Sequence, residues 1–294
     1  MTNLAESPRP TNHKPASNGK ASELKASISA SIDALAQAVD AVRASETFKQ
    51  FLAMQARFHR YSWHNSILIA TQRPDASQVA GYRTWQSMGR QVRKGEKGIA
   101  IIAPCPFKRE VKKSESEAET VDGIFFRVVH VFDIAQTDGE DLPTVEVPTV
   151  DAMADRLLAD LCRVAVSRGI RVDFKPLSGG TFGVSKSGAI DIDNRHASGQ
   201  QAKTLAHELA HEALHWKIEG PITRNIAELE AEAVAFVVCM HFGLDVEVRA
   251  SRYIAVWQGD SKGLRASMDR IAKTARDIID AVESGSESVM GVAA

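Results

Sequence analysis

The chain has 294 residues, of which 44% are hydrophobic and 25% charged, and its formal net charge is −1. This composition excludes a wholly disordered or fibrous chain, and the length favours two domains, each large enough to bury a core of its own. The first residues lack the apolar segment of a signal peptide, and no apolar run approaches the roughly 18 to 20 residues that span a bilayer. Three widely spaced cysteines without a CxxC pair indicate neither a disulfide framework nor a thiolate zinc site. We therefore expect a cytoplasmic protein with no membrane partner.

The net charge conceals a basic segment in the first half of the chain. Between Phe48 and Glu110 there are eleven basic and three acidic residues, which gives this segment a net charge of +8. A locally basic domain inside a neutral protein indicates a polyanionic partner.

The first 23 residues are rich in Pro, Ser, Asn and Lys, which is typical of a disordered tail. Apolar residues at three-and-four spacing predict amphipathic helices between Ser27 and Ala56, and a further helix is expected over Trp63–Thr71. Alternating β-branched segments at Gly98–Ala103 and Phe125–Phe132 predict two strands, joined by a long exposed loop over Glu110–Gly123. We expect these elements to form one domain over residues 24–140.

A stretch with Gly, two prolines and acidic residues follows, and we expect it to be a linker over residues 141–149. The elements predicted beyond it are a helix over Val150–Val166, strands around Val172–Phe174 and Gly183–Ile192, and a run of helices from Gln200 onwards. We expect a second domain over residues 150–282, mostly helical with a small sheet, and a flexible tail over residues 283–294. The predicted fold class is α+β with two domains.

The segment Thr204–Trp216 (TLAHELAHEALHW) carries an HExxH motif within a run of good helix formers. His207 and His211 stand four residues apart, so both project from one face of a helix and can bind the same ion. Glu208 then has the position of the general base of HExxH metallopeptidases. The alternative interpretation of the histidine pair is a solvated or hydrogen-bonded helix face. The motif predicts a zinc site with Glu208 as the catalytic residue.

A second helix supplies candidates for the third metal ligand. Glu228 and Glu232 are four residues apart at the start of an apolar segment, so both lie on one side of that helix. This ExxxE element resembles the gluzincin pattern, in which the first carboxylate binds the metal and the second holds a ligating histidine. The resemblance implies Glu228 as ligand and Glu232 behind the histidine, with the reverse assignment left open. Glu230 is interpreted as a peripheral carboxylate, and His215, two turns beyond the first histidine, as a packing or supporting residue.

Two further features have both a functional and a structural interpretation. The strand at Gly188–Asp193 is a candidate edge on which an extended peptide pairs, although an ordinary sheet edge explains it equally well. Tyr253 is a candidate proton donor to an oxyanion, although helix packing is the more common role of such a tyrosine.

Aromatic and basic side chains are interleaved in three segments of the first domain, Tyr61–Asn65, Val79–Trp85 and Gly89–Gly98. Single-stranded nucleic acid requires this combination, because bases stack on exposed rings while cations follow the phosphates. The alternative is that the aromatic residues belong to the core and the charges to a solvated face. From the residues alone, the two interpretations are equally supported.

The ordered motifs across both halves resemble the ArdC-type antirestriction proteins of conjugative plasmids. The resemblance covers roughly residues 45–258 and rests on the segments Tyr61–Pro104 and Val131–Pro143, followed by HELAH and ELEAE. It implies an amino-terminal domain that binds single-stranded DNA and a zincin-like metallopeptidase domain, in a protein that protects incoming plasmid DNA from restriction. Many relatives have Gly before the second histidine where this chain has Ala210, a change that a helix tolerates. The positions that match the DNA-binding block of the family are Trp63, Asn65, Tyr82, Trp85, Arg90, Arg93, Lys94 and Lys97.

The sequence therefore predicts a protein that binds single-stranded DNA without sequence preference, carries a Zn²⁺ site in a gluzincin-like domain and acts in antirestriction during plasmid transfer. Another divalent metal such as Mn²⁺ is the alternative cofactor. The expected partners are single-stranded DNA and a protein substrate, with a restriction system as its candidate source. Two other functions fit the same motifs: a DNA-coating protein whose metal domain is structural or vestigial, and a regulatory protease of the ImmA/IrrE-like type.

Overall fold

The computed structural model describes residues 18–37, 41–112, 118–140, 149–216, 222–246 and 260–290. Helices and small sheets alternate along the chain, and the second half is mostly helical, so the predicted α+β class with two domains is confirmed. Among the helices in these ranges, none combines the length and the apolarity that crossing a membrane requires.

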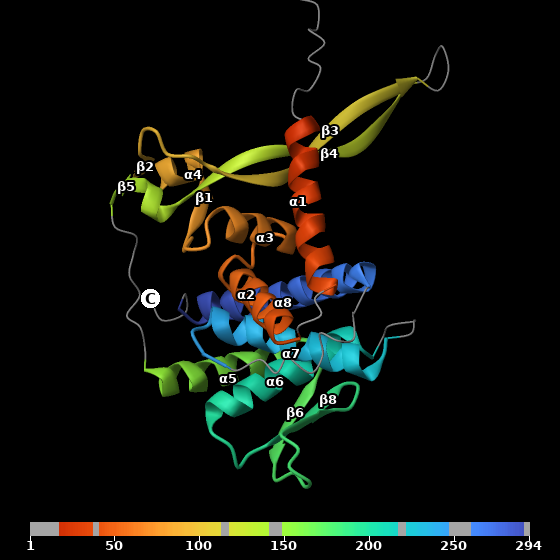
Figure 1. Ribbon diagram of the computed structural model, residues 1–294. Helices are drawn as coiled ribbons and strands as arrows, with labels where there is room; N and C mark the ends of the chain where they lie inside the picture. Colours follow the sequence, from red (N-terminus) through yellow and green to blue (C-terminus); the bar gives the residue numbers. More distant parts are fainter. Residues whose placement is uncertain are drawn as a thin grey trace, which may run out of the picture.

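The amino-terminal half combines helices with two small sheets (Figure 1). Its elements are α1 (Asn18–Ala36), α2 (Ala41–Arg57), α3 (Trp63–Gln72), β1 (Val79–Gly81), α4 (Tyr82–Ser87), β2 (Arg90–Val92), β3 (Ile99–Lys112), β4 (Ala118–Asp133), the 3-10 helix η1 (Ile134–Gln136) and β5 (Thr137–Gly139). Strand β4 lies between β1 and β3 in an antiparallel sheet, and β2 pairs with β5 in a separate sheet. The predicted helix over Trp63–Thr71 is confirmed as α3. Its start is set by Ser62, whose hydroxyl accepts a hydrogen bond from the backbone N–H of Asn65.

Strands β3 and β4 form a long hairpin that extends away from the helices in Figure 1. Backbone pairing runs from Ile99 opposite Val131 to Lys112 opposite Ala118. The predicted loop over Glu110–Gly123 is therefore wrong, because both strands continue into that stretch. Backbone hydrogen bonds pair two strands whatever side chains they carry, so the strands continue beyond the apolar alternation.

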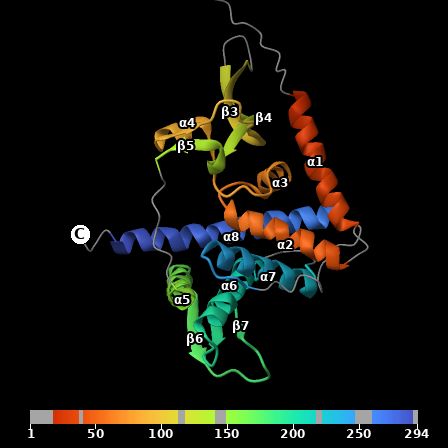
Figure 2. The ribbon, with the colours of Figure 1, turned by 60° about the vertical axis from the view of Figure 1, so that its left-hand side comes forward.

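The carboxy-terminal half places a small mixed sheet beside a layer of helices (Figure 2). Its elements are α5 (Val150–Ser167), β6 (Arg171–Lys175), β7 (Gly183–Ser185), β8 (Ala189–Asp193), α6 (Ser198–Leu214), α7 (Arg224–His241) and α8 (Ser261–Met290). Strand β8 is central, parallel to β6 and antiparallel to β7. The predicted strand Gly183–Ile192 is thus two strands, separated by a turn in which Ser187 and Gly188 have positive φ. The assignment of Gly188–Asp193 as the sheet edge is also wrong, because β6 and β7 flank it.

Two predicted chain ends are more ordered than their composition indicates. Helix α1 begins at Asn18, within the predicted tail of residues 1–23, and α8 continues to Met290, within the predicted tail of residues 283–294. A helix that has already formed extends into polar residues at little cost. Composition alone therefore placed both helix ends too far from the termini.

The predicted linker of residues 141–149 lies outside the described residues apart from Thr149. The Thr149 hydroxyl accepts a hydrogen bond from the backbone N–H of Ala152, which caps α5 at the start predicted for it. Tyr253, considered above as a proton donor, also lies outside the described residues.

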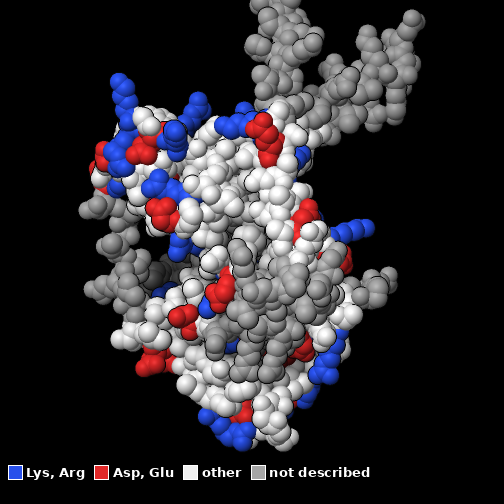
Figure 3. All heavy atoms as spheres, in the orientation of Figure 1, with Lys and Arg blue, Asp and Glu red and all other residues white. Residues whose placement is uncertain are grey.

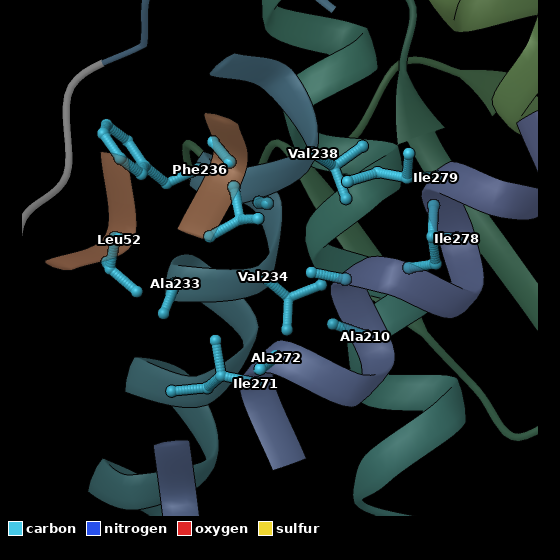
Figure 4. Packing of buried hydrophobic residues seen from close by; sticks show 14 of the residues in the cluster. Leu52, Ala210, Ala233, Val234, Phe236, Val238, Ile271, Ala272, Ile278 and Ile279 are labelled. Carbon is cyan, nitrogen blue, oxygen red and sulfur yellow. The ribbon is translucent and has the colours of Figure 1, made fainter. Parts of the chain in front are cut away.

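The two halves share one hydrophobic core. Helix α8 lies across the molecule in Figure 2, where it contacts α1 and α3 of the first half and α5, α6 and α7 of the second. Figure 4 shows Leu52 of α2 in one cluster with Phe236 of α7 and Ile271 of α8. The length allows each domain a core of its own, but the apolar faces of α1 and α2 are covered by helices of the other half.

Polar contacts join the same helices. The indole N–H of Trp63 donates to Asp269 of α8 at 2.5 Å. Arg276 of α8 donates to the carbonyl oxygens of His59 and Tyr61 at 2.7 and 2.6 Å. Helix α8 therefore fixes the segment that connects α2 to α3.

Candidate metal centre and basic surface

Helix α6 brings the two motif histidines together. Leu205 and Leu209 are fully buried on its core face, whereas His207 and His211 line a cleft of about 870 Å³. The Nε2 atoms of the two histidines are 3.0 Å apart. A spacing of four residues produces this contact because such residues lie one turn apart on the same helix face.

Helix α7 supplies the third group. Oε2 of Glu228 lies 3.5 Å from Nε2 of His207 and 3.8 Å from Nε2 of His211. Two imidazole nitrogens that face each other at 3.0 Å need a proton or a cation between their lone pairs, and the carboxylate favours the cation. The structure thus brings together the three residues predicted as ligands.

Neighbouring side chains hold the other ring nitrogens of both histidines. Nδ1 of His207 lies 3.6 Å from Oε2 of Glu232, and Lys203 donates to Oε1 of Glu232 at 2.8 Å. Nδ1 of His211 is 2.8 Å from Nδ1 of His215. A ring protonated on Nδ1 leaves Nε2 able to bind a metal. Glu232 therefore lies on the Nδ1 side of His207 and Glu228 on its Nε2 side, a geometry that favours Glu228 as the ligand.

Glu230 is not the peripheral carboxylate that the sequence predicts. It is 0% exposed and accepts hydrogen bonds from Ser267 and Arg270 of α8. It also lies 3.4 Å from Nε2 of His215. Position 230 is about half a helical turn from Glu228, so its side chain faces α8 instead of the cleft. A buried carboxylate needs such partners, since desolvation of an unpaired charge is costly.

Burial and neighbouring charges shift the pKa values at this centre. Burial opposes protonation of His207, but the carboxylates of Glu228 and Glu232 raise the pKa of His207 to about 9. Hydrogen bonds with His207 and His211 hold the pKa of Glu228 far below its usual range. The centre therefore attracts positive charge, and a divalent cation that binds there replaces protons on the ring nitrogens.

Glu208 lies in the wall of the same cleft. It is 8% exposed, and burial raises the pKa of its carboxyl above the usual value. A Cβ atom added to Gly183 of β7 would lie 3.1 Å from the Glu208 side chain and 2.5 Å from Cγ2 of Thr204. Gly183 therefore lets the edge strand approach α6 at the position of the predicted general base.

Glu212 ties the edge strand to α6. Its two carboxylate oxygens accept hydrogen bonds from the Ser185 hydroxyl at 2.5 Å and from the backbone N–H of Gly188 at 2.7 Å. Phe182 and Trp216, which are 43% and 51% exposed, also line the cleft. The cleft thus combines a fixed strand, the candidate ligands and exposed apolar side chains.

Three of the residues predicted to bind DNA are buried. Trp63 and Trp85 are 3% and 2% exposed, and both indole N–H groups donate to partners inside the protein. Asn65 is 9% exposed, and its amide bonds both the N–H and the C=O of Ile102. A base cannot stack on a ring without an exposed face. These three predictions of DNA contact are therefore corrected, because the side chains hold the domain together.

Tyr82, Lys94 and Lys97 remain at the surface beside β2. Tyr82 is 42% exposed, and it lines a cavity of about 600 Å³ together with Lys94. Both lysines are exposed, and within the described part of the chain neither ammonium group has an ion-pair or hydrogen-bond partner. Figure 3 shows basic side chains gathered over the region where Figure 1 places α4, β2 and β5.

The two predicted arginines of this region have partners within the protein. Arg90 donates to the Thr137 hydroxyl at 2.8 Å, across the β2–β5 pair. Arg93 pairs with Glu96 at 2.9 Å and with Asp138 at 3.3 Å. Their first role is therefore to support the β2–β5 sheet and the turn after β2.

Comparison with known proteins assigns both halves of the chain. Residues 20–132 match the family model of the N-terminal domain of anti-restriction factor ArdC. Residues 166–243 match the Peptidase_M78 model, described as the IrrE N-terminal-like domain. The chain has the two domains of an ArdC-type protein. The predicted resemblance is confirmed, and the second half of the chain has a metallopeptidase-like fold.

Individual relatives of the chain have low sequence identity to it. An uncharacterised protein of Bacillus anthracis is 24% identical over 283 residues, and the match covers 81% of this chain and 48% of that protein. Protein y4eC of Sinorhizobium fredii, also uncharacterised, is 25% identical over 217 residues, with 68% of each chain covered. The chain thus spans about half the length of the first relative.

Two similar solved structures are crystal structures of the antirestriction ArdC protein from the R388 plasmid. The metal-free structure is 21% identical, with a TM-score of 0.48 and coverage of 78% of this chain and 86% of that chain. The Mn(II)-bound structure is 20% identical, with a TM-score of 0.45 and coverage of 76% and 84%.

The residues of the candidate metal centre fit a divalent cation. Two imidazoles and a carboxylate form a donor set that zinc and other first-row metals bind. A tetrahedral ion with ligands at about 2.0–2.2 Å places ligand atoms roughly 3.3 Å apart. The distances among the three candidate atoms are 3.0, 3.5 and 3.8 Å. Three protein ligands also leave a coordination position open, as catalytic sites require.

Sequence reasoning missed three supporting residues of this centre, Lys203, Glu212 and Glu230. Each pairs with a group on another element, so no spacing within its own helix reveals it. One signal was present for Glu230: Ala233, Val234 and Val237 follow it at spacings of three, four and seven residues, which places its carboxylate on the apolar face of α7, where burial without a partner is costly.

Proposed function

We propose that this ArdC-type protein is a cytoplasmic antirestriction protein of a conjugative plasmid, which binds single-stranded DNA without sequence preference and hydrolyses a peptide bond at a zinc centre. The observation that carries the peptidase half is the convergence of His207, His211 and Glu228 in a cleft beside Glu208. The match to the ArdC N-terminal domain supports the DNA-binding half.

Each residue of the centre has a chemical role in this proposal. His207, His211 and Glu228 hold the ion, which when bound polarises a substrate carbonyl and makes water more acidic. Glu208 accepts a proton from the attacking water and passes it to the nitrogen of the leaving amine. The burial that raises the pKa of Glu208 brings its basicity closer to the value that this transfer needs.

The proposed substrate is an extended peptide. Strand β7 is an edge of its sheet, so a further strand can pair with its outer backbone groups. Exposed apolar side chains beside it favour apolar substrate residues near the cleaved bond. Because Gly183 approaches Glu208, a peptide along β7 places its backbone next to the general base.

The proposed DNA surface is smaller than the sequence predicts. Tyr82 offers an exposed ring for one base, and Lys94 and Lys97 offer ammonium groups for neighbouring phosphates. Phosphate contacts carry no sequence information, so this surface favours binding without sequence preference.

Fluorescence anisotropy on the full-length protein tests the DNA-binding half. A single-stranded oligonucleotide should bind more tightly than the duplex of the same sequence, because the duplex hides the base faces. Lys94→Ala/Lys97→Ala should flatten the dependence of log K on log salt by roughly one to two, at about 0.7 per phosphate contact. Lys262→Ala/Lys273→Ala, which removes two exposed lysines of α8, is the matched control. Equal affinity for both forms of DNA would contradict single-strand preference.

Glu208→Gln tests the peptidase half, because it removes the base and keeps all three candidate ligands. Metal content and unfolding temperature should match the wild type, while cleavage of a peptide library, read by mass spectrometry, should fall at least about 100-fold. Plasmid transfer into cells with an active restriction system should also lose its protection. His207→Ala/His211→Ala should lose the ion from the cleft.

A DNA-coating protein is the second candidate function. Figure 1 shows β2 at one end of the ribbon and β6 and β8 at the other, and β7, which lines the cleft, pairs with β8. The surface beside β2 is therefore separate from the cleft, which favours DNA binding that is independent of it. Under this alternative, Glu208→Gln protects plasmid DNA as well as the wild type does. A regulatory protease would need the cleft but not the basic surface, so Lys94→Ala/Lys97→Ala would leave its activity unchanged.

A further inference from the structure

A second cluster of histidine and carboxylate groups lies where the two halves meet. Within the described residues, His59, His241 and Glu283 each offer a ligand atom within 4.8 Å of the others. His59 lies between α2 and α3, His241 is the last residue of α7, and Glu283 belongs to α8. The cluster thus joins three elements that are far apart in the sequence, and none of its residues belongs to the cleft.

The ring of His59 is buried, and its nitrogen atoms lack hydrogen bonds to the described residues. The residue is 6% exposed, and within the described ranges neither ring nitrogen has a hydrogen-bond partner. Its Nε2 atom is 3.9 Å from Oδ1 of Asp280, and its ring centroid is 4.3 Å from that of His241. Buried polar atoms without partners are rare and costly, and they call for a missing partner such as an ion.

His241 presents a ring nitrogen toward Glu283. Its Nδ1 lies 3.0 Å from the carbonyl oxygen of Ala56, so Nδ1 is the protonated donor. Its Nε2 is 3.1 Å from Oε1 of Glu283. When the ring is neutral and protonated on Nδ1, Nε2 of His241 and Oε1 of Glu283 are both hydrogen-bond acceptors. Two acceptors this close repel each other, and a cation between them removes the repulsion. Their distance is close to the roughly 3.3 Å that separates ligand atoms around tetrahedral zinc.

We propose that His59, His241 and Glu283 bind a zinc ion that joins the two halves of the protein. Asp280, one turn before Glu283 on α8, has Oδ1 3.9 Å from Nε2 of His59 and is a candidate for the fourth position of the ion. The cluster lies between helices and outside the cleft, so its role is structural. The ion ties the α2–α3 segment to the ends of α7 and α8.

The electrostatic surroundings favour this site. Two carboxylates, Glu283 and Asp280, lie beside the histidines, and Arg60 pairs with Glu283. Arg60 lies 3.2 Å from Oε2 of Glu283, the oxygen that does not contact His241, and its side chain is 75% exposed. Solvent therefore screens most of the Arg60 charge.

Zinc content of the full-length protein tests the proposal in the His207→Ala/His211→Ala background, which disables the cleft. After chelation and dialysis against micromolar free Zn²⁺, elemental analysis should find one ion per chain in this variant and two in the wild type. Adding His241→Gln or Glu283→Gln should remove the remaining ion. His130→Gln and Glu46→Gln change an exposed histidine and an exposed glutamate outside the cluster, and they should leave it bound.

Thermal unfolding provides a second measurement. Zn²⁺ should raise Tm in the His207→Ala/His211→Ala background, because an ion that binds only the folded state stabilises it. The rise should disappear when Glu283→Gln is added. That side chain is 32% exposed, and circular dichroism verifies that the variant folds. The proposal would be overturned if the His207→Ala/His211→Ala variant bound no zinc. It would also be overturned if the zinc content and the Tm shift of that variant persisted after His241→Gln or Glu283→Gln was added.

Discussion

Glu208, Glu228 and Glu230 are three acidic residues of one region, yet their surroundings give them different chemistry. Glu228 faces two imidazoles, whose hydrogen bonds hold its pKa far below the usual range and keep it in the form that binds metals. Glu230 is fully buried against Ser267 and Arg270, so it joins α7 to α8. Burial raises the pKa of Glu208, which suits a residue that exchanges a proton. The role of each carboxylate therefore follows from the protein groups that surround it in place of water.

Tyr82 and Trp85 are close in sequence but differ in exposure, and alanine substitution should separate their roles. Trp85→Ala removes a ring that is 2% exposed and should lower the free energy of unfolding by about 3–5 kcal/mol. Tyr82→Ala removes a ring that is 42% exposed. It should change the free energy of unfolding by less than about 1 kcal/mol, while weakening binding of single-stranded DNA by about 1–3 kcal/mol.

Urea unfolding and anisotropy on the two full-length variants measure these effects. A Trp85→Ala protein that folds like the wild type but binds DNA weakly would restore Trp85 as a contact residue. A Tyr82→Ala protein with unchanged affinity would remove Tyr82 from the DNA surface.

At the scale of elements, the short strand β7 decides the shape of the cleft. At Gly183, β7 lies so close to α6 that a larger side chain would not fit. At the other end of the strand, Glu212 of α6 accepts hydrogen bonds from Ser185 and Gly188. Its other neighbour is β8, so its outer edge lies beside the candidate metal centre. Three residues of strand are enough because α6 holds the strand at both ends.

Gly183→Ala should disturb this contact. The added Cβ would lie 2.5 Å from Cγ2 of Thr204, so we expect a loss of about 1–3 kcal/mol in the free energy of unfolding and slower peptide cleavage. Thr204→Ser removes that methyl group and keeps the hydroxyl that donates to the Gln200 carbonyl. Gly183→Ala/Thr204→Ser should therefore recover part of both losses.

Thermal denaturation and peptide cleavage measure the series. Gly19→Ala is its control, since a Cβ there meets no atom within 4 Å. A Gly183→Ala protein as stable and active as the wild type would show that β7 is not held against α6.

At the scale of the whole molecule, the two family domains are not two separate cores. Phe48 and Leu52 of α2 are 0% and 1% exposed within a cluster that includes α7 and α8. Separation of the halves would expose the apolar faces of both. Binding to either half is therefore coupled to the stability of the other through α8.

A fragment of residues 18–140 should fold incompletely for this reason. Helices α1 and α2 lose the apolar cover of α7 and α8, and Trp63 loses its hydrogen bond to Asp269. We expect reduced helical circular dichroism, binding of a hydrophobic dye and no cooperative thermal transition, whereas the full chain unfolds in one. A fragment that melts cooperatively near the temperature of the full chain would show that the shared core is dispensable.

Local spacing by itself determined the parts of the site that one element contains. His207 and His211 meet because residues four apart on any α-helix share a face, and the same repeat places Glu228 and Glu232 together. Helices α3 and α5 were predictable for a similar reason, since apolar periodicity and capping residues act within one segment. The ordered motifs across the chain also identified the pair of domains.

Only the tertiary structure decided which side chains are buried and what they contact. It placed Trp63 and Trp85 in the core and Tyr82 at the surface, although all three are aromatic residues among basic ones. It also brought His59 and Glu283 together across most of the chain. Burial and ion pairing depend on the element that covers a residue, and periodicity within one segment does not reveal which element that is.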